Sequence, residues 1–128
     1  MNAMIVQLED KPGSLAHLAQ VLGDAGVNIE TGAGLVLGAA GGFGFIADDE
    51  HNAMAALDGA GITCRMVEVV MADVKDEPGG LAAVARRLAD AGVNLELVVP
   101  ARIGGERMGI AFGVSDAAAA RAALGITD

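Results

Sequence analysis

Apolar and polar residues alternate over residues 4–9, and this two-residue period predicts a β-strand. The turn sequence Asp10-Lys11-Pro12-Gly13 follows, and from Ser14 the apolar positions fall at helical spacing. Gly26 is placed to end that helix, and extended structure is expected to resume at Val27. The chain therefore opens with a predicted strand, a turn, a helix and a second strand.

A glycine-rich hairpin is predicted next, followed by a strand over residues 43–47. A second helix should run through Leu57, with Asp49, Glu50 or Asn52 as its cap. A strand over residues 62–67 then completes the order β-α-β-β-α-β.

The same pattern occurs twice. Residues 8–30 read LEDKPGSLAHLAQVLGDAGVNIE, and residues 74–96 read VKDEPGGLAAVARRLADAGVNLE, with 13 of the 23 aligned positions identical. A repeat of this length indicates one structural unit used twice. Helical spacing on the repeated segments predicts that six apolar side chains are buried: Leu15, Leu18, Leu22, Leu81, Val84 and Leu88.

The fold class is therefore α+β, with two ferredoxin-like βαββαβ units, each an antiparallel sheet with its helices on one face. The units are assigned to residues 1–67 and 68–128. No turn residue interrupts residues 62–74, so we expect a rigid connection with a bulge or bend near Glu68. Gly125-Ile126-Thr127 repeats Gly61-Ile62-Thr63 just before Asp128, which predicts that the second unit lacks most of its last strand.

Two features favour a homodimer. A missing last strand leaves a sheet edge that another chain can pair with. In addition, the strand over residues 108–114 carries large residues on one side and only glycine or alanine on the other. We expect this small-residue face to accept a second backbone, sheet or ligand.

Composition narrows the class of protein. Seventeen acidic against eight basic residues give a formal charge of −9, and there is no tryptophan or tyrosine, so a nucleic-acid partner is not expected. No apolar run approaches the length of a membrane helix, and no secretion signal is found. The single cysteine, Cys64, lies in an apolar run, and its side chain is expected to pack inertly in a cytoplasmic protein.

Neither a catalytic centre nor a metal or cofactor site is predicted. His17 and His51 have no Cys, Asp or Glu at ligand spacing, so both are interpreted as solvated surface. The glycines from Gly32 to Gly42 superficially resemble a nucleotide-binding loop. A dinucleotide site needs a helix after that loop, whereas the residues after Gly42 read as a strand.

The repeated segments resemble tandem ACT domains, small βαββαβ modules that bind amino acids and regulate metabolic enzymes. The resemblance rests on Asp10-Lys11-Pro12-Gly13-Ser14-Leu15 with Gly26-Val27-Asn28-Ile29, and on Asp76-Glu77-Pro78-Gly79-Gly80-Leu81 with Gly92-Val93-Asn94-Leu95. It covers nearly the whole chain. It implies a non-enzymatic regulatory protein with an amino-acid ligand at a module interface, or a small subunit that regulates a biosynthetic enzyme in trans.

The ligand-binding positions that the resemblance implies are the first β-α loop and the following asparagine of each unit. They are Asp10, Lys11, Pro12, Gly13, Ser14, Asn28, Asp76, Glu77, Pro78, Gly79, Gly80 and Asn94. Free N–H groups at a helix start suit a carboxylate, and an amide suits both ends of an amino acid. Other roles stay open: the loops can be simple turns, the asparagines can cap turns, and Asp10 and Asp76 can act as helix-start charges.

Overall fold

The chain folds into two α+β units. The computed structural model describes residues 1–102 and 107–126. Contacts divide the chain into a first unit, Asn2–Met66, and a second unit that begins at Val67 and includes Met1. The elements of the first unit are β1 (Asn2–Leu8), α1 (Ser14–Asp24), β2 (Ile29–Leu37), β3 (Ala40–Ala47) and α2 (Glu50–Gly59). The strand β4 (Cys64–Lys75) passes from the first unit into the second, which continues with α3 (Gly80–Asp90), β5 (Leu95–Arg102), β6 (Arg107–Val114) and α4 (Ala117–Leu124).

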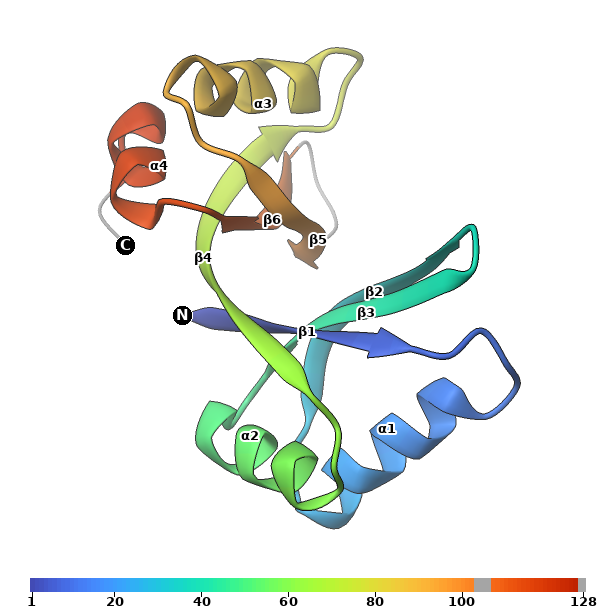
Figure 1. Ribbon diagram of the computed structural model, residues 1–128. Coiled ribbons are helices and arrows are strands. Elements are labelled where there is room, and N and C mark those ends of the chain that lie inside the picture. Colours follow the sequence, from blue (N-terminus) through green and yellow to red (C-terminus); the bar gives the residue numbers. More distant parts are fainter. Residues whose placement is uncertain (103–106, 127–128) are drawn as a thin grey trace. The chain divides into compact units, whose positions relative to one another are not determined.

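The strand order matches the predicted fold class. In the first unit the strands neighbour one another in the order β2-β3-β1-β4, and in the second the order is β4-β6-β5. The pairings of β1 with β3, β2 with β3, β4 with β6 and β5 with β6 are antiparallel. The two helices of each unit pack beside each other on one side of its strands (Figure 1). An α+β fold with antiparallel sheets is therefore confirmed.

Each unit has its own apolar core. In the first, Leu18 and Leu22 of α1 pack with Phe45 of β3, and all three side chains are fully buried. In the second, Leu88 of α3 packs with Phe112 of β6. Burying a side chain of this size contributes about 1.5–3 kcal/mol, so these residues account for much of the helix–sheet attachment.

Two of the six predicted core positions are wrong. Leu15 and Leu81 are 49% and 48% exposed, and Val84 is half-buried. Both leucines lie in the first turn of their helices, next to the loop that joins strand and helix. Helical spacing predicts the correct face, but it cannot show that the first turn is poorly covered.

The β2–β3 hairpin is longer than the sequence predicted. Its strands continue to Leu37 and resume at Ala40, so a two-residue turn with Gly38 at φ 65° joins them. A Cβ at Gly32 would lie 2.7 Å from Cζ of Phe43. The Phe43 ring fills the space beside Gly32, so a larger residue there would require the ring to shift. The glycine-rich residues before Gly38 belong to strand β2.

The connection between the units is a strand. The pairing of β4 with β6 runs in regular register from Glu68 to Lys75. Because this ladder begins at Glu68, the bulge or bend near that residue stays a prediction. After α4 no strand follows among the described residues, which end at Ile126, and the second unit is therefore left with three strands. Thr127 and Asp128 lie outside the described residues.

The small-residue face of β6 is formed by Gly109, Ala111 and Gly113. A Cβ at Gly113 would lie 3.0 Å from Cβ of Leu97 and 3.0 Å from Cγ1 of Val67. Side chains of the second unit therefore flank Gly113 closely. That this face accepts a second backbone, sheet or ligand stays a prediction.

Candidate ligand-binding site

The two repeated loops both end in a glycine that starts a helix. Gly13 is the N-cap of α1 with φ 92°, and Gly79 is the N-cap of α3 with φ 86°. These left-handed angles suit glycine and are unfavourable for other residues. The glycine that both repeats share at this position therefore sets the angle at which the chain enters the helix.

Neither of these helices has a side-chain cap. The N-terminus of α1 receives no side-chain hydrogen bond, its first turn holds no acidic residue, and the same is true of α3. By contrast, Asp49 accepts a hydrogen bond from the backbone N–H of Asn52 at the start of α2, and Asp116 accepts one from Ala119 at the start of α4. The N–H groups of Ser14 and Gly80 donate to the carbonyls of Lys11 and Glu77 at 3.4 and 3.0 Å. The next two N–H groups of α1 and α3 stay free at the positive end of the helix dipole, where a carboxylate binds favourably.

A cavity of about 690 Å³ lies beside the first loop. Its lining includes the predicted residues Lys11, Pro12, Gly13 and Ser14. Its other lining residues come from β1, α1, the hairpin turn and the segment between α2 and β4: Gln7, Leu8, Glu9, His17, Leu18, Ala39, Gly61, Ile62 and Thr63. This volume lies within the range of sites for small molecules.

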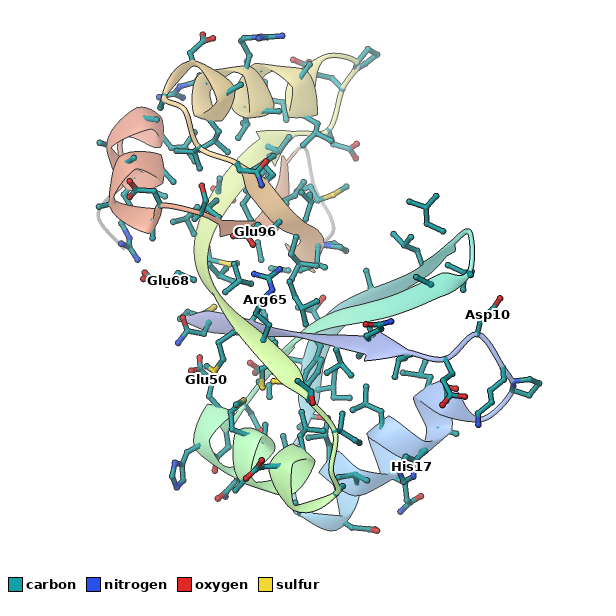
Figure 2. All side chains as sticks on the ribbon, viewed as in Figure 1. Asp10, His17, Glu50, Arg65, Glu68 and Glu96 are labelled. Atoms are coloured by element: carbon teal, nitrogen blue, oxygen red, sulfur yellow. The ribbon has the colours of Figure 1, made fainter. Side chains whose placement is uncertain are left out.

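His17 and Thr63 also line this cavity. Sequence reasoning interpreted His17 as solvated surface, and His17 is exposed, whereas Thr63 was not singled out. His17 lies one helical turn after Ser14, and Figure 2 shows it on α1 near the segment that leads from α2 into β4. The spacing of three residues between Ser14 and His17 was a usable signal, because such positions share a helix face. Thr63 had no such signal, because only the folded chain brings the α2–β4 segment to the loop.

Asp10 lies on the other side of the loop. It lines a second cavity of about 350 Å³, together with Leu15 and with Leu35 and Val36 of the hairpin. Figure 2 shows the Asp10 side chain pointing away from α1, and no side chain caps that helix. Asp10 therefore does not cap α1 through a hydrogen bond.

The second loop packs more tightly at the start of its helix than the first loop does. Gly80, at the position aligned with Ser14, is buried, and a Cβ placed on it would overlap the carbonyl oxygen of Lys75. Ser14 is only half-buried. The remaining predicted residues of this loop, Asp76, Glu77, Pro78 and Gly79, are exposed.

The charges of the two loops are exchanged. In the first, Nζ of Lys11 lies 3.1 Å from Oε2 of Glu9, and both side chains are largely exposed. The aligned residues of the second loop are Glu77 and Lys75. An exposed ion pair of this kind contributes little stability, about 0–1 kcal/mol. The difference between the loops is therefore the sign of the charge beside the helix start.

Asn28 and Asn94 lie beyond the far ends of α1 and α3. The N–H of Asn28 donates to Oδ1 of Asp48 at 2.9 Å, and its carbonyl accepts from the N–H of Asp48 at 3.0 Å. Asn94 makes the corresponding bonds with Ser115 at 3.0 and 3.1 Å. In both repeats the asparagine backbone thus joins the start of one strand to the end of its neighbour.

The asparagine side chains remain available. Gly26, with φ 74°, ends α1, and the N–H of Val27 donates to the carbonyl of Leu22 at 3.0 Å, which completes the helix end without an amide side chain. Both Asn28 and Asn94 are exposed, and within the described part of the chain neither amide side chain has a hydrogen-bond partner. The helix end therefore does not require them as caps.

The loop and the asparagine of one unit cannot both contact one small ligand. They lie at opposite ends of α1, an 11-residue helix, and 1.5 Å per residue gives a length of about 16 Å. The structure brings Lys11, Pro12, Gly13 and Ser14 together around a cavity, and it separates Asn28 from them.

Cys64 is half-buried, and its thiol lies 3.2 Å from Sδ of Met54. Burial raises the pKa of the Cys64 thiol, so little thiolate forms at neutral pH. Residues 1–102 and 107–126 hold no cluster of three or more His, Cys, Asp or Glu side chains that could bind a metal ion. No helix in those residues is long and apolar enough to cross a membrane.

Comparison with known proteins defines the fold. The sequence matches no protein-family model and no curated protein. Its structure resembles protein BT0572 from Bacteroides thetaiotaomicron, with a TM-score of 0.79 and 22% identity over 97% of this chain and 85% of that one. It also resembles the regulatory subunits of aspartate kinase from Thermus flavus and Thermus thermophilus, with TM-scores of 0.71 and 0.68 and identities of 21% and 19%.

These alignments cover 96% of this chain and 88% and 87% of the two regulatory subunits. The likeness therefore extends over both units and over most of each relative. At the level of fold, the predicted resemblance to tandem ACT domains is confirmed.

Proposed function

We propose that the chain is a non-enzymatic regulatory protein that binds an amino acid or a similar small carboxylate. The observation that carries this proposal is the contrast among its four helix N-termini. The two in the repeated loops are uncapped, whereas Asp49 and Asp116 cap the other two. An uncapped N-terminus beside a cavity of about 690 Å³ suits the carboxylate of a small ligand.

The proposed ligand lies at an interface between modules. The loop turns Pro12-Gly13-Ser14 and Pro78-Gly79-Gly80 present the free N–H groups at the helix starts, and Asn28 or Asn94 supplies an amide. In α1 these free groups belong to Leu15 and Ala16. The length of α1 supports this arrangement, because a loop and an asparagine can meet at one ligand only if they come from different modules. Two modules with their first helices side by side and antiparallel would satisfy this condition.

A homodimer is part of the proposal. Strand β2 is at the edge of the first sheet, and Leu35, Val36 and Leu37 on it are 67%, 52% and 79% exposed. Residues 31–47 carry no charged side chain. Exposed edge strands without charges or proline pair readily with another chain. Sedimentation should give about twice the 12.7 kDa mass of one chain. Leu37→Lys should shift the measured mass toward that of a single chain.

A second candidate function is regulation of a biosynthetic enzyme in trans. The likeness to two aspartate kinase regulatory subunits over 87–88% of their lengths favours it. Purification from the source cell should then recover a larger enzyme with the chain, whereas a protein that acts alone should purify without one. We propose a cytoplasmic location under both candidate functions.

The test begins with a thermal-shift panel of the twenty amino acids. The amino acid with the largest shift is then titrated by calorimetry into the wild type, Asn28→Ala and Asn94→Ala. Loss of one or two hydrogen bonds, each worth about 0.5–1.5 kcal/mol or up to about 3 if charged, predicts roughly ten- to hundred-fold weaker binding in at least one variant. Each asparagine is the matched control for the other, and unchanged affinity in both would mean that the site excludes them. Absence of any shift across the panel would refute amino-acid binding itself.

A further inference from the structure

The cavity beside the first loop has polar groups beyond the repeated motif. His17 projects from α1, and Thr63 comes from the segment between α2 and β4, so the two residues belong to different elements and line one space with Ser14. Both side chains are exposed and free to meet a ligand from solvent. Three polar residues, two from α1 and one from the α2–β4 segment, thus line one cavity.

Two of these three residues have no polar counterpart in the second repeat, and the counterpart of Thr63, which is Thr127, lies outside the described residues. His17 corresponds to Ala83, and Ser14 corresponds to Gly80, which is packed against the Lys75 carbonyl. The repeats therefore share an uncapped helix but not the polar side chains next to it. A group that only the first unit has is suited to distinguishing ligands, whereas the shared groups suit the part common to all amino acids.

We propose that His17 and Thr63 bind the side chain of the ligand, and that the site selects small amino acids with a side-chain oxygen. This inference rests on the proposed function, because it places the ligand carboxylate at the N-terminus of α1. Residues three apart on a helix have Cβ atoms about 5–6 Å apart. A ligand held near Ser14 therefore reaches His17 with a side chain of two to four heavy atoms.

Such a side chain carries a hydroxyl, amide or carboxylate oxygen. The hydroxyl of Thr63 and the imidazole of His17 can each donate to that oxygen. An apolar side chain of the same shape would leave both groups without a partner, and this is the basis on which sites of this kind reject isosteric ligands.

The experiment uses threonine and valine, which have the same shape but differ in one hydroxyl. Calorimetry measures both with the wild type, His17→Ala and Thr63→Val, with His51→Ala as the control for loss of an exposed histidine. His51 lines a different cavity. Aspartate and asparagine then compare a charged with a neutral side-chain oxygen. Thermal melting confirms that each variant is folded.

We expect threonine to bind the wild type about ten-fold more tightly than valine. That ratio should fall at least three-fold in His17→Ala and in Thr63→Val and stay unchanged in His51→Ala. Equal binding of threonine and valine to the wild type, or an unchanged ratio in both site variants, would overturn the inference and leave the proposed function standing. If amino acids bind but neither of these two does, the inference also fails. Absence of binding by every amino acid would refute both.

Discussion

A carboxylate placed in the first turn of α1 tests whether the positive end of this helix dipole lacks a compensating negative charge. Ala16 is the third residue of α1 and is exposed, so Ala16→Glu adds the charge without disturbing the core. The helix dipole should stabilise the new carboxylate by about 0.3–1 kcal/mol. For 128 residues that unfold in one transition, an unfolding entropy of about 2.1 cal/mol/K per residue converts this into a rise in Tm of about 1–4 °C.

The same substitution should weaken ligand binding. If the ligand carboxylate lies about 6 Å from the new charge, repulsion at an effective dielectric constant between protein surface and water amounts to about 1–2 kcal/mol. This corresponds to about five- to thirty-fold weaker binding. Ala82→Glu is the matched control, because Ala82 is exposed at the aligned position of α3. It should raise Tm by a similar amount and leave the affinity unchanged if the first loop binds the ligand.

The assays are differential scanning calorimetry for Tm and isothermal calorimetry for affinity, both at low salt, where the charge effect is largest. A fall in Tm for Ala16→Glu together with an unchanged affinity would refute the reasoning. That result would mean that the first turn of α1 already has its hydrogen-bonding and electrostatic partners.

Three further predictions concern packing and reactivity. Gly80→Ala should lower the free energy of unfolding by about 1–3 kcal/mol in urea titrations, because its Cβ would overlap the Lys75 carbonyl. Ser14→Ala should change the free energy of unfolding by less than about 0.5 kcal/mol. Equal effects would mean that the two loops pack equally tightly at the helix start. Leu18→Ala should cost about 2–5 kcal/mol in the same titrations because Leu18 is fully buried, and Leu15→Ala, half exposed, should cost less than about 1 kcal/mol; the reverse order would contradict the assigned core. Burial raises the pKa of the Cys64 thiol, so iodoacetamide should label the native chain at pH 7.5 at least several-fold more slowly than the urea-unfolded chain. The labelling rate of the native chain should rise as pH increases. Equal labelling rates in both states would show that folding does not protect the thiol.

Sequence patterns predicted most of the fold because the repeat supplied each element twice. The order β-α-β-β-α-β follows from changes of period and from turn residues, and these are local properties. The hairpin was predicted too short because Gly32 reads as a turn residue when the ring of Phe43 beside it is unknown. At Gly113 the sequence likewise shows a small residue without showing that Val67 and Leu97 flank it closely.

The candidate site was predictable only in part. The loop residues from Lys11 to Ser14 could be found because both repeats preserve the turn. Thr63 belongs to a distant segment that tertiary structure brings to the loop, so no spacing could reveal it. The separation of Asn28 from the loop follows from the length of α1, which the sequence did predict, and it is compatible with the predicted site at an interface between modules.

The most direct test of amino-acid binding at the first loop follows backbone amide resonances by two-dimensional NMR. The amino acid that gives the largest thermal shift is titrated into isotopically labelled protein. The proposal predicts saturable shifts for the N–H groups of Leu15 and Ala16, which the helix N-terminus presents to the ligand, and smaller shifts for those of Leu81 and Ala82. Saturable shifts confined to other segments, with Leu15 and Ala16 unchanged, would contradict it.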